Sequence, residues 1–281
     1  MNNNIAVLIT CYNRKIKTLK CLQNLNDIDF PKNIDNLDVY LVDDASTDGT
    51  YNAVKNTFPK VKLIKGSGDL FWNHGMRLAW EEASQTKEYD FYLWLNDDVV
   101  LEQFALEHLF DCYKEALKLY KNPAIITGAF KNTKLGNEFS YGGRIDSGNV
   151  IPNGKLQECK YINGNAVLVS KQVYNKLGNL SSDYTHTMGD FDYGLRALEA
   201  GFNNCTTKRY IGFCPVNDSP DWSNPNVPLK ERLKLFKSPT GLSYKEYIVF
   251  RKKFWGNKWV VFAFKAYMKV MFPSFYKKLK K

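Results

Sequence analysis

The first hundred residues alternate between short, continuously apolar runs and longer segments whose apolar residues recur every three or four positions. The runs are typical of buried strands and the longer segments of amphipathic helices. They predict strands at 5–10, 37–44, 61–65 and 91–96, and helices at 18–25, 48–58, 74–84 and from the fourth strand to about 119. Because strands buried on both faces read as unbroken apolar runs, this part of the chain predicts a parallel sheet covered by helices on both sides.

From about residue 124 the pattern changes to short strands separated by Gly and Asn turns. Strands are expected at 124–130, 138–145 and 160–170, and helices at 171–177 and from 190 to just before Gly201. Residues 216–228 are polar and rich in proline, and a helical, basic segment follows. We therefore expect an α/β protein with a domain at 1–215, made of halves 1–123 and 124–215, followed by a linker and tail at 216–281.

Polar residues follow three of the predicted strands at the point where each strand ends. Thr10, Tyr12 and Asn13 come after the first strand, Asp43 and Asp44 after the second, and Asp97 and Asp98 after the fourth. In open α/β sheets ligands bind outside the carboxyl ends of the strands. Asp97 and Asp98 also stand between two apolar runs, where burying a charge costs several kcal/mol unless something compensates it. The pattern predicts a ligand site at this rim.

Composition and charge narrow the class of protein. With 44% hydrophobic and 24% charged residues and a mean hydropathy of −0.40, the 281-residue chain is expected to be globular with a sizeable core. Residues 245–281 hold eleven of the 39 Lys and Arg but one of the 29 Asp and Glu, so the rest is balanced with 28 of each. A neutral body with a basic tail argues against a nucleic-acid-binding core and for a tail that meets an anionic surface.

The cysteines and the lengths of the apolar runs bear on location. The six cysteines show neither CxxC nor metal-ligand spacing, which predicts free thiols in a reducing compartment. The apolar run at 5–10 is too short for a signal peptide, and no apolar stretch reaches the 18 residues of a spanning helix. We expect a cytoplasmic protein.

Four motifs, in this order and spacing, resemble those of the family 2 glycosyltransferases, which have the GT-A fold. They are LITCYNR, LVDDASTDGT, LWLNDD and GDFDYGLRALEAGF, and the resemblance covers roughly residues 5–215. It implies a Rossmann-like, mostly parallel sheet with an appended mixed sheet on the acceptor side and a C-terminal helical tail.

The resemblance also implies how the nucleotide of a sugar donor is bound. Thr10 and Tyr12 would contact the base, by a hydrogen bond and by stacking, although Tyr12 also fits a simple loop aromatic. Asp44 would accept the N3–H of uracil or thymine. Asp48 is the better candidate for a helix cap, which leaves Asp43 and Asp44 without an evident structural role. Arg14, Gly68 and Asp97 complete the expected nucleotide contacts.

In NDD, which resembles the DxD-type motif, Asn96 replaces the first Asp. Asp98 would bind Mg²⁺ or Mn²⁺ and Asp97 would face the ribose or the metal shell, because hard cations prefer oxygen ligands. The alternative is a plain Asp turn at a strand end. Some relatives supply a further histidine near the end of this region. Here Asn217, Asp218 or water would have to serve.

The last motif places Asp190 where the family has its catalytic base, preceded by Gly189 where Glu is usual. A helix N-cap is the alternative for Asp190, and both roles are compatible. Asp192 would be a secondary contact.

The segment from Gly66 to Trp80 occupies the position where the family contacts the donor. The glycines allow close backbone approach, and a helix starting near His74 would present N–H groups to a phosphate. Trp72, Asn73 and His74 are candidate donor or acceptor contacts, and His74 also fits a capping or packed role.

The resulting prediction is an inverting, metal-dependent transfer from a UDP- or dTDP-sugar to a hydroxyl of a saccharide, in cell-surface polysaccharide or lipid-linked glycan assembly. A dehydrogenase or nucleotidyltransferase would need a glycine-rich turn after the first strand, where the chain has TCYNR. The alternative of another class is a non-catalytic nucleotide-sugar or glycan-binding module.

The tail interleaves aromatic and basic residues. Trp255 and Trp259 are typical of a membrane interface, and the run from Trp259 to Phe272 is too short and too charged to span. We expect residues 245–281 to lie on an anionic membrane surface at the inner face of the cytoplasmic membrane. The alternative is packing against the catalytic domain or a second subunit, and the sequence leaves open whether the chain forms a homo-oligomer.

Overall fold

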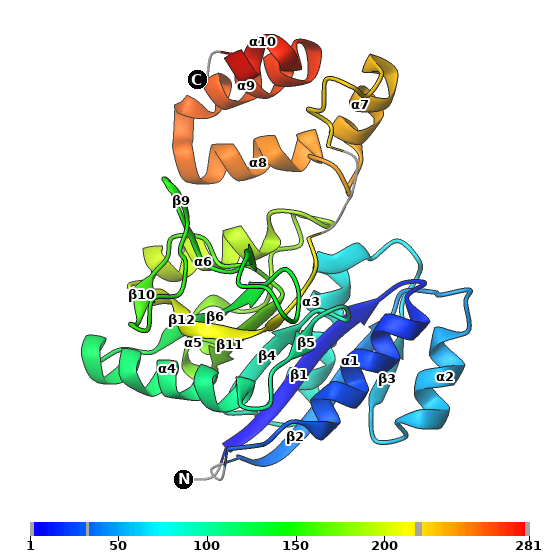
Figure 1. The fold of residues 1–281 in the computed structure, drawn as a ribbon, viewed down its shortest axis with the longest axis vertical. Helices are drawn as coiled ribbons and strands as arrows, with labels where there is room; N and C mark the ends of the chain where they lie inside the picture. The colour runs from blue at the N-terminus through cyan, green and yellow to red at the C-terminus, as the bar shows by residue number, and fades with distance from the viewer. Residues whose placement is uncertain (1–2, 32–33, 217–220, 279–281) are drawn as a thin grey trace.

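The chain folds around one large sheet, in a computed structural model that describes residues 3–31, 34–216 and 221–278. β1 is central to the first half: it pairs in parallel with β2 on one side and with β4 on the other, and β3 extends the sheet beyond β2. These strands are β1 (Asn3–Cys11), β2 (Ile34–Asp43), β3 (Lys62–Lys65) and β4 (Phe91–Leu95). The predicted parallel sheet is confirmed. Its strands run from the end of the molecule that holds the N-terminus toward the C-terminal helices (Figure 1).

The second half of the sheet is mixed, as predicted. β11 is antiparallel to both β4 and β6, and β6 is parallel to β12; β5 and β10 add to β12, and β7 adds to β6. A separate hairpin, β8–β9, stands beside the sheet. The bounds are β5 (Val100–Leu101), β6 (Ala124–Lys131), β7 (Phe139–Tyr141), β8 (Arg144–Ile145), β9 (Gly148–Asn149), β10 (Gln157–Glu158), β11 (Ala166–Ser170) and β12 (Asn203–Phe213).

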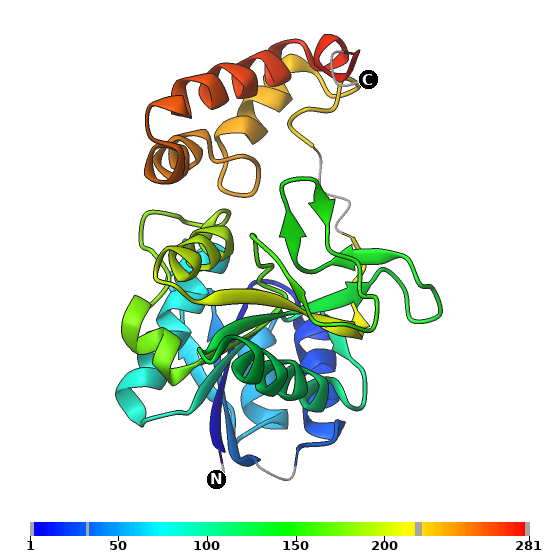
Figure 2. The ribbon, with the colours of Figure 1, turned by 90° about the vertical axis from the view of Figure 1, so that its left-hand side faces the viewer.

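Helices cover both faces of the sheet because successive strand side chains point to opposite sides. In β1, Val7 and Ile9 pack in one core with α1 (Lys15–Asp27), α2 (Thr50–Thr57) and α4 (Ala105–Tyr120). Ala6 and Leu8 pack in the other core with α3 (Phe71–Thr86), α5 (Lys171–Leu177) and α6 (Gly189–Glu199). The two helical layers appear on either side of the sheet in Figures 1 and 2.

β12 is an element that the sequence pattern did not predict. Its first half reads NNCTTKR, which is polar, yet Asn204, Thr206 and Thr207 are buried. The strand is buried because β6 and β10 pair with it and α4 packs against it. Tertiary contacts therefore override a weak strand pattern here.

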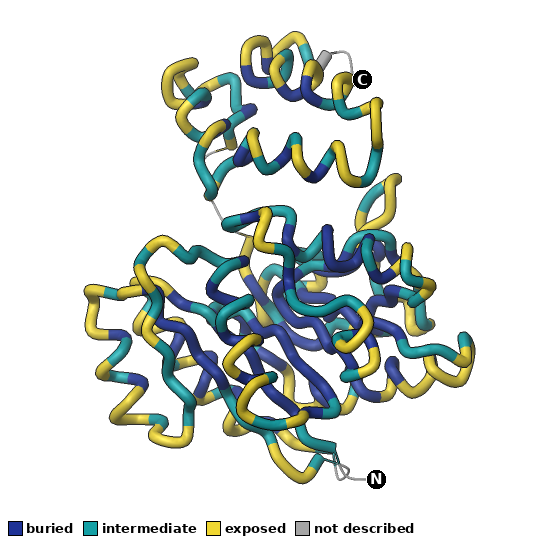
Figure 3. The backbone as a smooth tube through the Cα atoms, turned by 180° about the vertical axis from the view of Figure 1, so that it is seen from behind, coloured by how far each residue is buried: buried dark blue, intermediate teal, exposed yellow. Residues whose placement is uncertain are grey.

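The C-terminal helices form a unit on the far side of the site rim from the N-terminus. They are α7 (Leu229–Lys237), α8 (Tyr244–Trp255), the short 3₁₀ helix η1 (Gly256–Lys258), α9 (Trp259–Met271) and α10 (Pro273–Lys278). Figure 1 shows α8 as the helix nearest the catalytic half, with α9 and α10 beyond it, and Figure 3 shows that buried residues line the inner side of this unit. No helix in the described ranges is both long and apolar enough to cross a membrane.

Hydrogen bonds, an ion pair and apolar packing join α8 to the catalytic half. The Glu246 carboxylate accepts hydrogen bonds from the backbone N–H and hydroxyl of Thr185, at 3.1 and 2.6 Å. Lys253 Nζ lies 2.6 Å from the buried Asp192 carboxylate, and Phe250 packs in a cluster with Tyr184. The aromatics of α8 therefore pack on the protein, which was the alternative considered for the tail.

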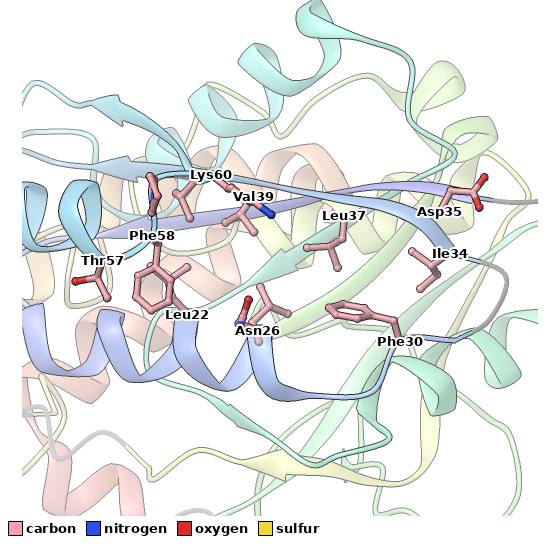
Figure 4. Close-up of a pocket in the computed structure, with 13 residues that line it drawn as sticks. Leu22, Asn26, Phe30, Ile34, Asp35, Leu37, Val39, Thr57, Phe58 and Lys60 are labelled. Carbon is pink, nitrogen blue, oxygen red and sulfur yellow. The ribbon is translucent and has the colours of Figure 1, made fainter.

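A cavity of about 510 Å³ lies far from the carboxyl ends of the strands (Figure 4). Its walls are the second half of α1, the start of β2 and the end of α2, with Leu22, Phe30 and Phe58 among its apolar side chains. Neither its position nor its lining relates it to the rim where the sequence places the site.

Candidate active site

Two loops at the carboxyl ends of β1 and β2 are held together by side chain to backbone bonds. Asn13 Oδ1 accepts the Thr47 N–H at 2.7 Å, and Ser46 Oγ accepts the Asn13 N–H at 2.8 Å. Asp48 accepts the N–H groups of Lys15 and Thr50, which begin α1 and α2. Gly49 is the N-cap residue of α2, so the predicted N-cap position of Asp48 is wrong, although its carboxylate accepts the first N–H group of both helices.

The Asp44 carboxylate, expected to bind the base, has three backbone partners. Oδ1 accepts the Gly68 N–H at 2.7 Å, and Oδ2 accepts those of Leu70 and Phe71 at 2.9 and 3.0 Å. Asp43 accepts the Ser46 N–H at 3.0 Å. The inference that these two acids have no structural role is therefore wrong. Asp44 anchors the loop that leads into α3, and its contact with a base stays a prediction.

Gly68 fits this anchoring loop because its φ of +97° lies in a region that side chains other than glycine rarely adopt. Gly66 is required for space, since a Cβ there would lie 2.7 Å from Asp44 Oδ1. The two glycines thus allow the loop backbone to lie close enough to Asp44 for its N–H groups to bond the carboxylate.

Thr10 and Tyr12 lie on the same rim but differ in exposure. The Tyr12 side chain is 53% exposed, which leaves its ring free to stack on a planar ligand. Thr10 is partly buried and packs against α3, where a Cβ on Gly75 would overlap its hydroxyl.

The start of α3 differs from its predicted use. The helix begins at Phe71, three residues before His74, because Asp44 accepts the N–H groups of Leu70 and Phe71. The next two N–H groups donate to His186 Nδ1 and to the Thr185 carbonyl. The expectation that this helix presents free N–H groups to a phosphate is wrong, since protein acceptors use them.

Three candidate contacts at the start of α3 have different surroundings. Trp72 Nε1 donates to Asn96 Oδ1 at 2.7 Å, so its ring lies beside the NDD segment. Asn73 is fully buried, and its amide donates to the carbonyls of Ser181 and Tyr184. His74 Nε2 lies 3.3 Å from the Ser182 carbonyl. Trp72 therefore faces the site, whereas Asn73 and His74 hold the loop at 181–184.

The charges of Asp97 and Asp98 are compensated by Arg14. Its Nη1 lies 3.1 Å from Asp97 Oδ1 and 2.9 Å from Asp98 Oδ2, and the two carboxylate side chains are only 5% and 7% exposed. Thr18 donates to the second oxygen of Asp97 at 3.0 Å. Burial raises the pKa of Asp97 to about 6, against the opposing effect of the Arg14 charge. The bottom of the site therefore holds two acids and one guanidinium.

These residues fit a divalent cation that is held largely by its nucleotide. Asp98 Oδ1 has as its partner in the described parts of the chain only the weakly donating Cys214 thiol, at 3.8 Å, so it can accept a cation. No group of three His, Cys, Asp or Glu within the described residues could hold a metal ion. Mg²⁺ commonly takes one or two carboxylates and completes its shell with phosphates and water, which matches one ligand from Asp98. Asn217 and Asp218, the other candidates, lie outside the described residues.

Asn96 departs from the family pattern for a reason visible in its hydrogen bonds. Its amide donates to Asn165 Oδ1 at 2.6 Å while its oxygen accepts from Trp72 Nε1. An aspartate could accept from Trp72 but could not donate to Asn165. Asn96 therefore orients the Trp72 ring.

Asp190 lies in the first turn of α6, where it is linked to the Trp72 ring through Gly164. Its Oδ1 accepts the Phe191 N–H at 2.8 Å, and its Oδ2 accepts the Gly164 N–H at 3.1 Å, where Gly164 packs against the Trp72 ring. Met188 is the N-cap residue of this helix, so Asp190 does not cap it. The two N–H groups instead fix the orientation of the Asp190 carboxylate. Burial raises the pKa of Asp190 to about 6, and the two N–H donors and the charge of Arg144 act in the opposite direction. Asp190 is ionised at neutral pH.

Gly189, where the family usually has Glu, is explained by packing. A Cβ at Gly189 would overlap Oδ1 of the buried Asn73. Asn73 fills the space that a side chain at position 189 would need.

Asp192 is placed differently from the expected substrate contact. It is fully buried, and its carboxylate is 2.6 Å from both Arg196 Nε and Lys253 Nζ and 3.2 Å from the Tyr184 hydroxyl. All of these partners come from α6, α8 and the loop before α6. Asp192 therefore links the C-terminal helices to the catalytic half.

His186 is a residue of the site that sequence reasoning missed. Its Nδ1 accepts the Trp72 N–H at 3.3 Å, and burial and the Arg14 charge lower its pKa, so the ring is neutral. No motif marks it in the sequence. Asn13, Ala45, Phe71 and Met188 have positive φ around this site, a strained backbone that only the structure reveals.

Comparison with known proteins decides the family. The sequence model of glycosyl transferase family 2 matches residues 6–155, which is more than half of the chain. The chain belongs to glycosyl transferase family 2. The predicted family is thus confirmed, and with it sugar transfer as the general activity. No curated protein matches the sequence.

Solved glycosyltransferases share the fold of this family 2 glycosyltransferase. A mannosyltransferase from Pyrobaculum calidifontis, solved with GDP-Man and Mn²⁺, superposes with a TM-score of 0.55 at 16% identity over 88% of this chain and 64% of its own. TarS residues 1–349 from S. aureus, solved with UDP-GlcNAc, superpose with a TM-score of 0.58 at 14% identity over 98% and 73%. The GT-A fold class is confirmed.

Proposed function

We propose that this glycosyltransferase moves a sugar from a UDP- or dTDP-activated donor to a hydroxyl of a saccharide, with inversion at the anomeric carbon. The observation that carries the proposal is the arrangement around Trp72. Asn96, which precedes Asp97 and Asp98, accepts a hydrogen bond from the Trp72 indole, and Gly164, which donates to the ionised Asp190, packs against the same ring. The comparisons support a nucleotide-sugar donor, because the mannosyltransferase and TarS described above were solved in complex with GDP-Man and UDP-GlcNAc.

In this proposal Asp190 is the general base. Its carboxylate takes the proton of the acceptor hydroxyl while the acceptor oxygen bonds to the anomeric carbon and the bond to the nucleoside diphosphate breaks. A pKa of about 6 keeps Asp190 ionised at pH 7 and still basic enough to accept a proton. Its two N–H donors fix the carboxylate before the acceptor arrives.

Asp98 would hold Mg²⁺ or Mn²⁺ together with the donor diphosphate, and the cation would neutralise the charge that develops on the leaving group. Mn²⁺ in the structure of the mannosyltransferase supports this cofactor. The Arg14 guanidinium, already between the two acids, would stay near the same phosphates or move aside. Tyr12 would stack on the base, and the remaining acceptor capacity of Asp44 Oδ1 would receive the base N–H.

We also propose that the enzyme lies on the inner face of the cytoplasmic membrane, where its acceptor would be. The outward side of the C-terminal unit supports this, because α9 and the start of α10 expose large apolar side chains that no described part of the chain covers. These are Val260, Val261, Phe264, Met271, Phe272 and Phe275. Lys258 and Lys265 are exposed in the same stretch. This pattern is typical of helices that lie in an anionic lipid interface.

A donor screen tests the proposed function. Purified full-length protein is incubated with UDP-, dTDP- and GDP-sugars and Mn²⁺, and free nucleoside diphosphate and calorimetric binding are both measured. We expect binding of a uridine or thymidine donor that EDTA weakens, and that Asp98→Asn weakens to the same extent. Lack of binding by every nucleotide-sugar would overturn the proposal. Tight binding without turnover for any acceptor would favour a non-catalytic binding module.

A further inference from the structure

A second cavity lies between the catalytic half and the C-terminal helices, at the start of α6. It has a volume of about 630 Å³. The hairpin β8–β9 and the start of α6 form one wall of the cavity, and α8 and α9 form the other (Figure 1). The charged and aromatic side chains that line the cavity include Arg144, Lys160, Tyr161, Phe191, Arg251 and Trp255.

The cavity carries a net positive charge. Three basic side chains line it against one acid, Asp146, which Lys160 already binds at 2.7 Å. In the described parts of the chain, no carboxylate lies within 4.0 Å of the guanidinium of Arg144 or Arg251. Two guanidinium groups are therefore available for an anion.

Arg251 gives independent evidence of a missing partner. Its Nε is buried and has no hydrogen-bond acceptor among the described residues. Its guanidinium is 4.4 Å from the Trp255 ring centre and 4.2 Å from that of Phe262. Cation–π contacts satisfy the charge in part, but a buried N–H without an acceptor is costly. A bound anion would supply that acceptor.

The position of the cavity links it to the proposed base. Phe191, which lines the cavity, directly follows Asp190 and donates its N–H to that carboxylate at 2.8 Å. The Arg144 charge also acts on Asp190, lowering its pKa against the effect of burial. The rings of Tyr161 and Phe191, 5.2 Å apart, provide an apolar surface beside the charged groups. The cavity therefore adjoins the first turn of α6, in which the proposed base is the residue before Phe191.

We propose that this cavity binds the acceptor, and that the acceptor carries a phosphate ester held by Arg144, Lys160 and Arg251. The inference rests on the proposed function. Arginine forks suit phosphate oxygens, and three cations against one acid suit a group with more than one negative charge. The same chemistry belongs to a soluble sugar phosphate and to the phosphate of a lipid-linked saccharide, and the experiment separates these two sources.

The test measures acceptor binding in the absence of donor and divalent cation, so that it does not depend on glycosyl transfer. Glucose 1-phosphate, glucose, and neutral vesicles with and without a polyprenyl phosphate are titrated against the full chain, and the Trp255 contribution to fluorescence is isolated with Trp255→Phe. We expect a phosphate-bearing probe to bind and glucose not to bind. Arg144→Gln and Arg251→Gln should each weaken binding about tenfold. Lys252→Gln, a neighbour on α8 outside the cavity, should change it less than twofold.

The outcomes separate this inference from the proposed function. Binding of glucose 1-phosphate alone supports a soluble acceptor, and binding of the lipid phosphate alone supports a lipid-linked one. Equal binding of glucose, no binding of either phosphate, or unchanged binding in Arg144→Gln overturns the inference. Because Arg144 is exposed on a hairpin, its replacement keeps the test valid even if Arg251→Gln fails to fold. Loss of donor binding with retained phosphate binding would reject the proposed function alone.

Discussion

Replacing Asp190 with Asn removes the proposed base while it keeps the size of the side chain. The structure predicts a small effect on folding because two terms oppose each other. Burial raises the pKa of Asp190 from 3.8 to about 6, so the ionised form costs the folded state about 3 kcal/mol. Asn removes that cost. However, its Nδ2 cannot accept, so the N–H of Phe191 or of Gly164 loses its partner, at a cost of about 1–3 kcal/mol.

The sign of the pH dependence follows from the raised pKa. The folded state favours the protonated acid, so the cost is absent below pH 3.8, grows as the pH rises, and is complete above about pH 6. At pH 7 the two terms nearly cancel, and we expect the melting temperature of Asp190→Asn to stay within a few degrees of the parent. Near pH 4 the variant should be the less stable protein, because only the unpaired N–H remains.

The catalytic effect should be much larger than the effect on stability. Loss of a general base costs about 10²–10⁴-fold in rate, or roughly 3–5 kcal/mol of transition-state stabilisation. The assay is release of nucleoside diphosphate at saturating acceptor, with donor affinity measured separately by calorimetry. The parent rate should fall about tenfold per pH unit below pH 6, whereas the residual rate of the variant should not. Asp183→Asn, an exposed acid in the preceding loop, serves as the matched control. Turnover of Asp190→Asn within about tenfold of the parent, at unchanged donor affinity, would refute the role of Asp190 as base.

Three further predictions test the packing around the site and the outer helices. Asp192→Asn should lower the free energy of unfolding by about 3 kcal/mol in a denaturant melt, because two cations lose a fully buried carboxylate, and a change below 1 kcal/mol would contradict this. Gly189→Ala should lower the free energy of unfolding by about 1–3 kcal/mol, because the new Cβ competes with Asn73 for space. In a double-mutant cycle with Asn73→Ala, the double variant should lose less stability than the sum of the two single variants. Additive losses would mean that the two positions do not compete for space. Phe264→Ser on α9, where the side chain is 66% exposed, should reduce flotation with anionic liposomes about tenfold relative to Phe104→Ser, which is 51% exposed on the catalytic half. Equal flotation of these two variants would exclude a membrane contact through this face of α9.

Liposome flotation with point variants is preferable to removal of the tail. α8 covers Tyr184 and supplies Lys253 to Asp192, so truncation at residue 243 would expose an apolar surface and leave a buried charge unpaired. A truncated chain would then fail for reasons unrelated to lipid. A single substitution on the outer side of α9 leaves these contacts in place.

The parallel half of the sheet could be predicted because its strands are apolar on both faces. Val7 and Leu8 are adjacent in sequence and fully buried in different cores, which is the burial expected of a strand covered on both faces. β12 could not be predicted in the same way. Its buried Asn204 and Thr206 look like loop residues until β6 and β10 are placed beside them.

The location of the candidate site could be predicted because it follows from where the strands end. The hydrogen-bond partners of its side chains could not be predicted. The carboxyl ends of β1, β2 and β4 converge, so Tyr12, Asp44 and Asp97 lie at one rim. The sequence did not reveal that Asp44 is occupied by backbone N–H groups or that His186 approaches Trp72 from the loop before α6. Both depend on long-range contacts of a loop whose conformation no local pattern specifies.

The C-terminal unit has two faces with different chemistry, and this bears on how the acceptor reaches Asp190. On α9, Phe262 lines the cationic cavity, whereas Phe264, two residues later, is exposed on the outer side with Val260 and Val261. If α9 rests on a lipid surface, the cavity lies on the opposite side of the same helix, one helix diameter or about 10 Å away. A phosphate at a membrane headgroup could reach the cavity only around the edge of this unit. Loss of flotation should therefore raise the KM for a lipid-linked acceptor and leave the KM for a soluble sugar phosphate unchanged. An equal rise for both acceptors would mean that α9 shapes the cavity and does not position the enzyme on a membrane.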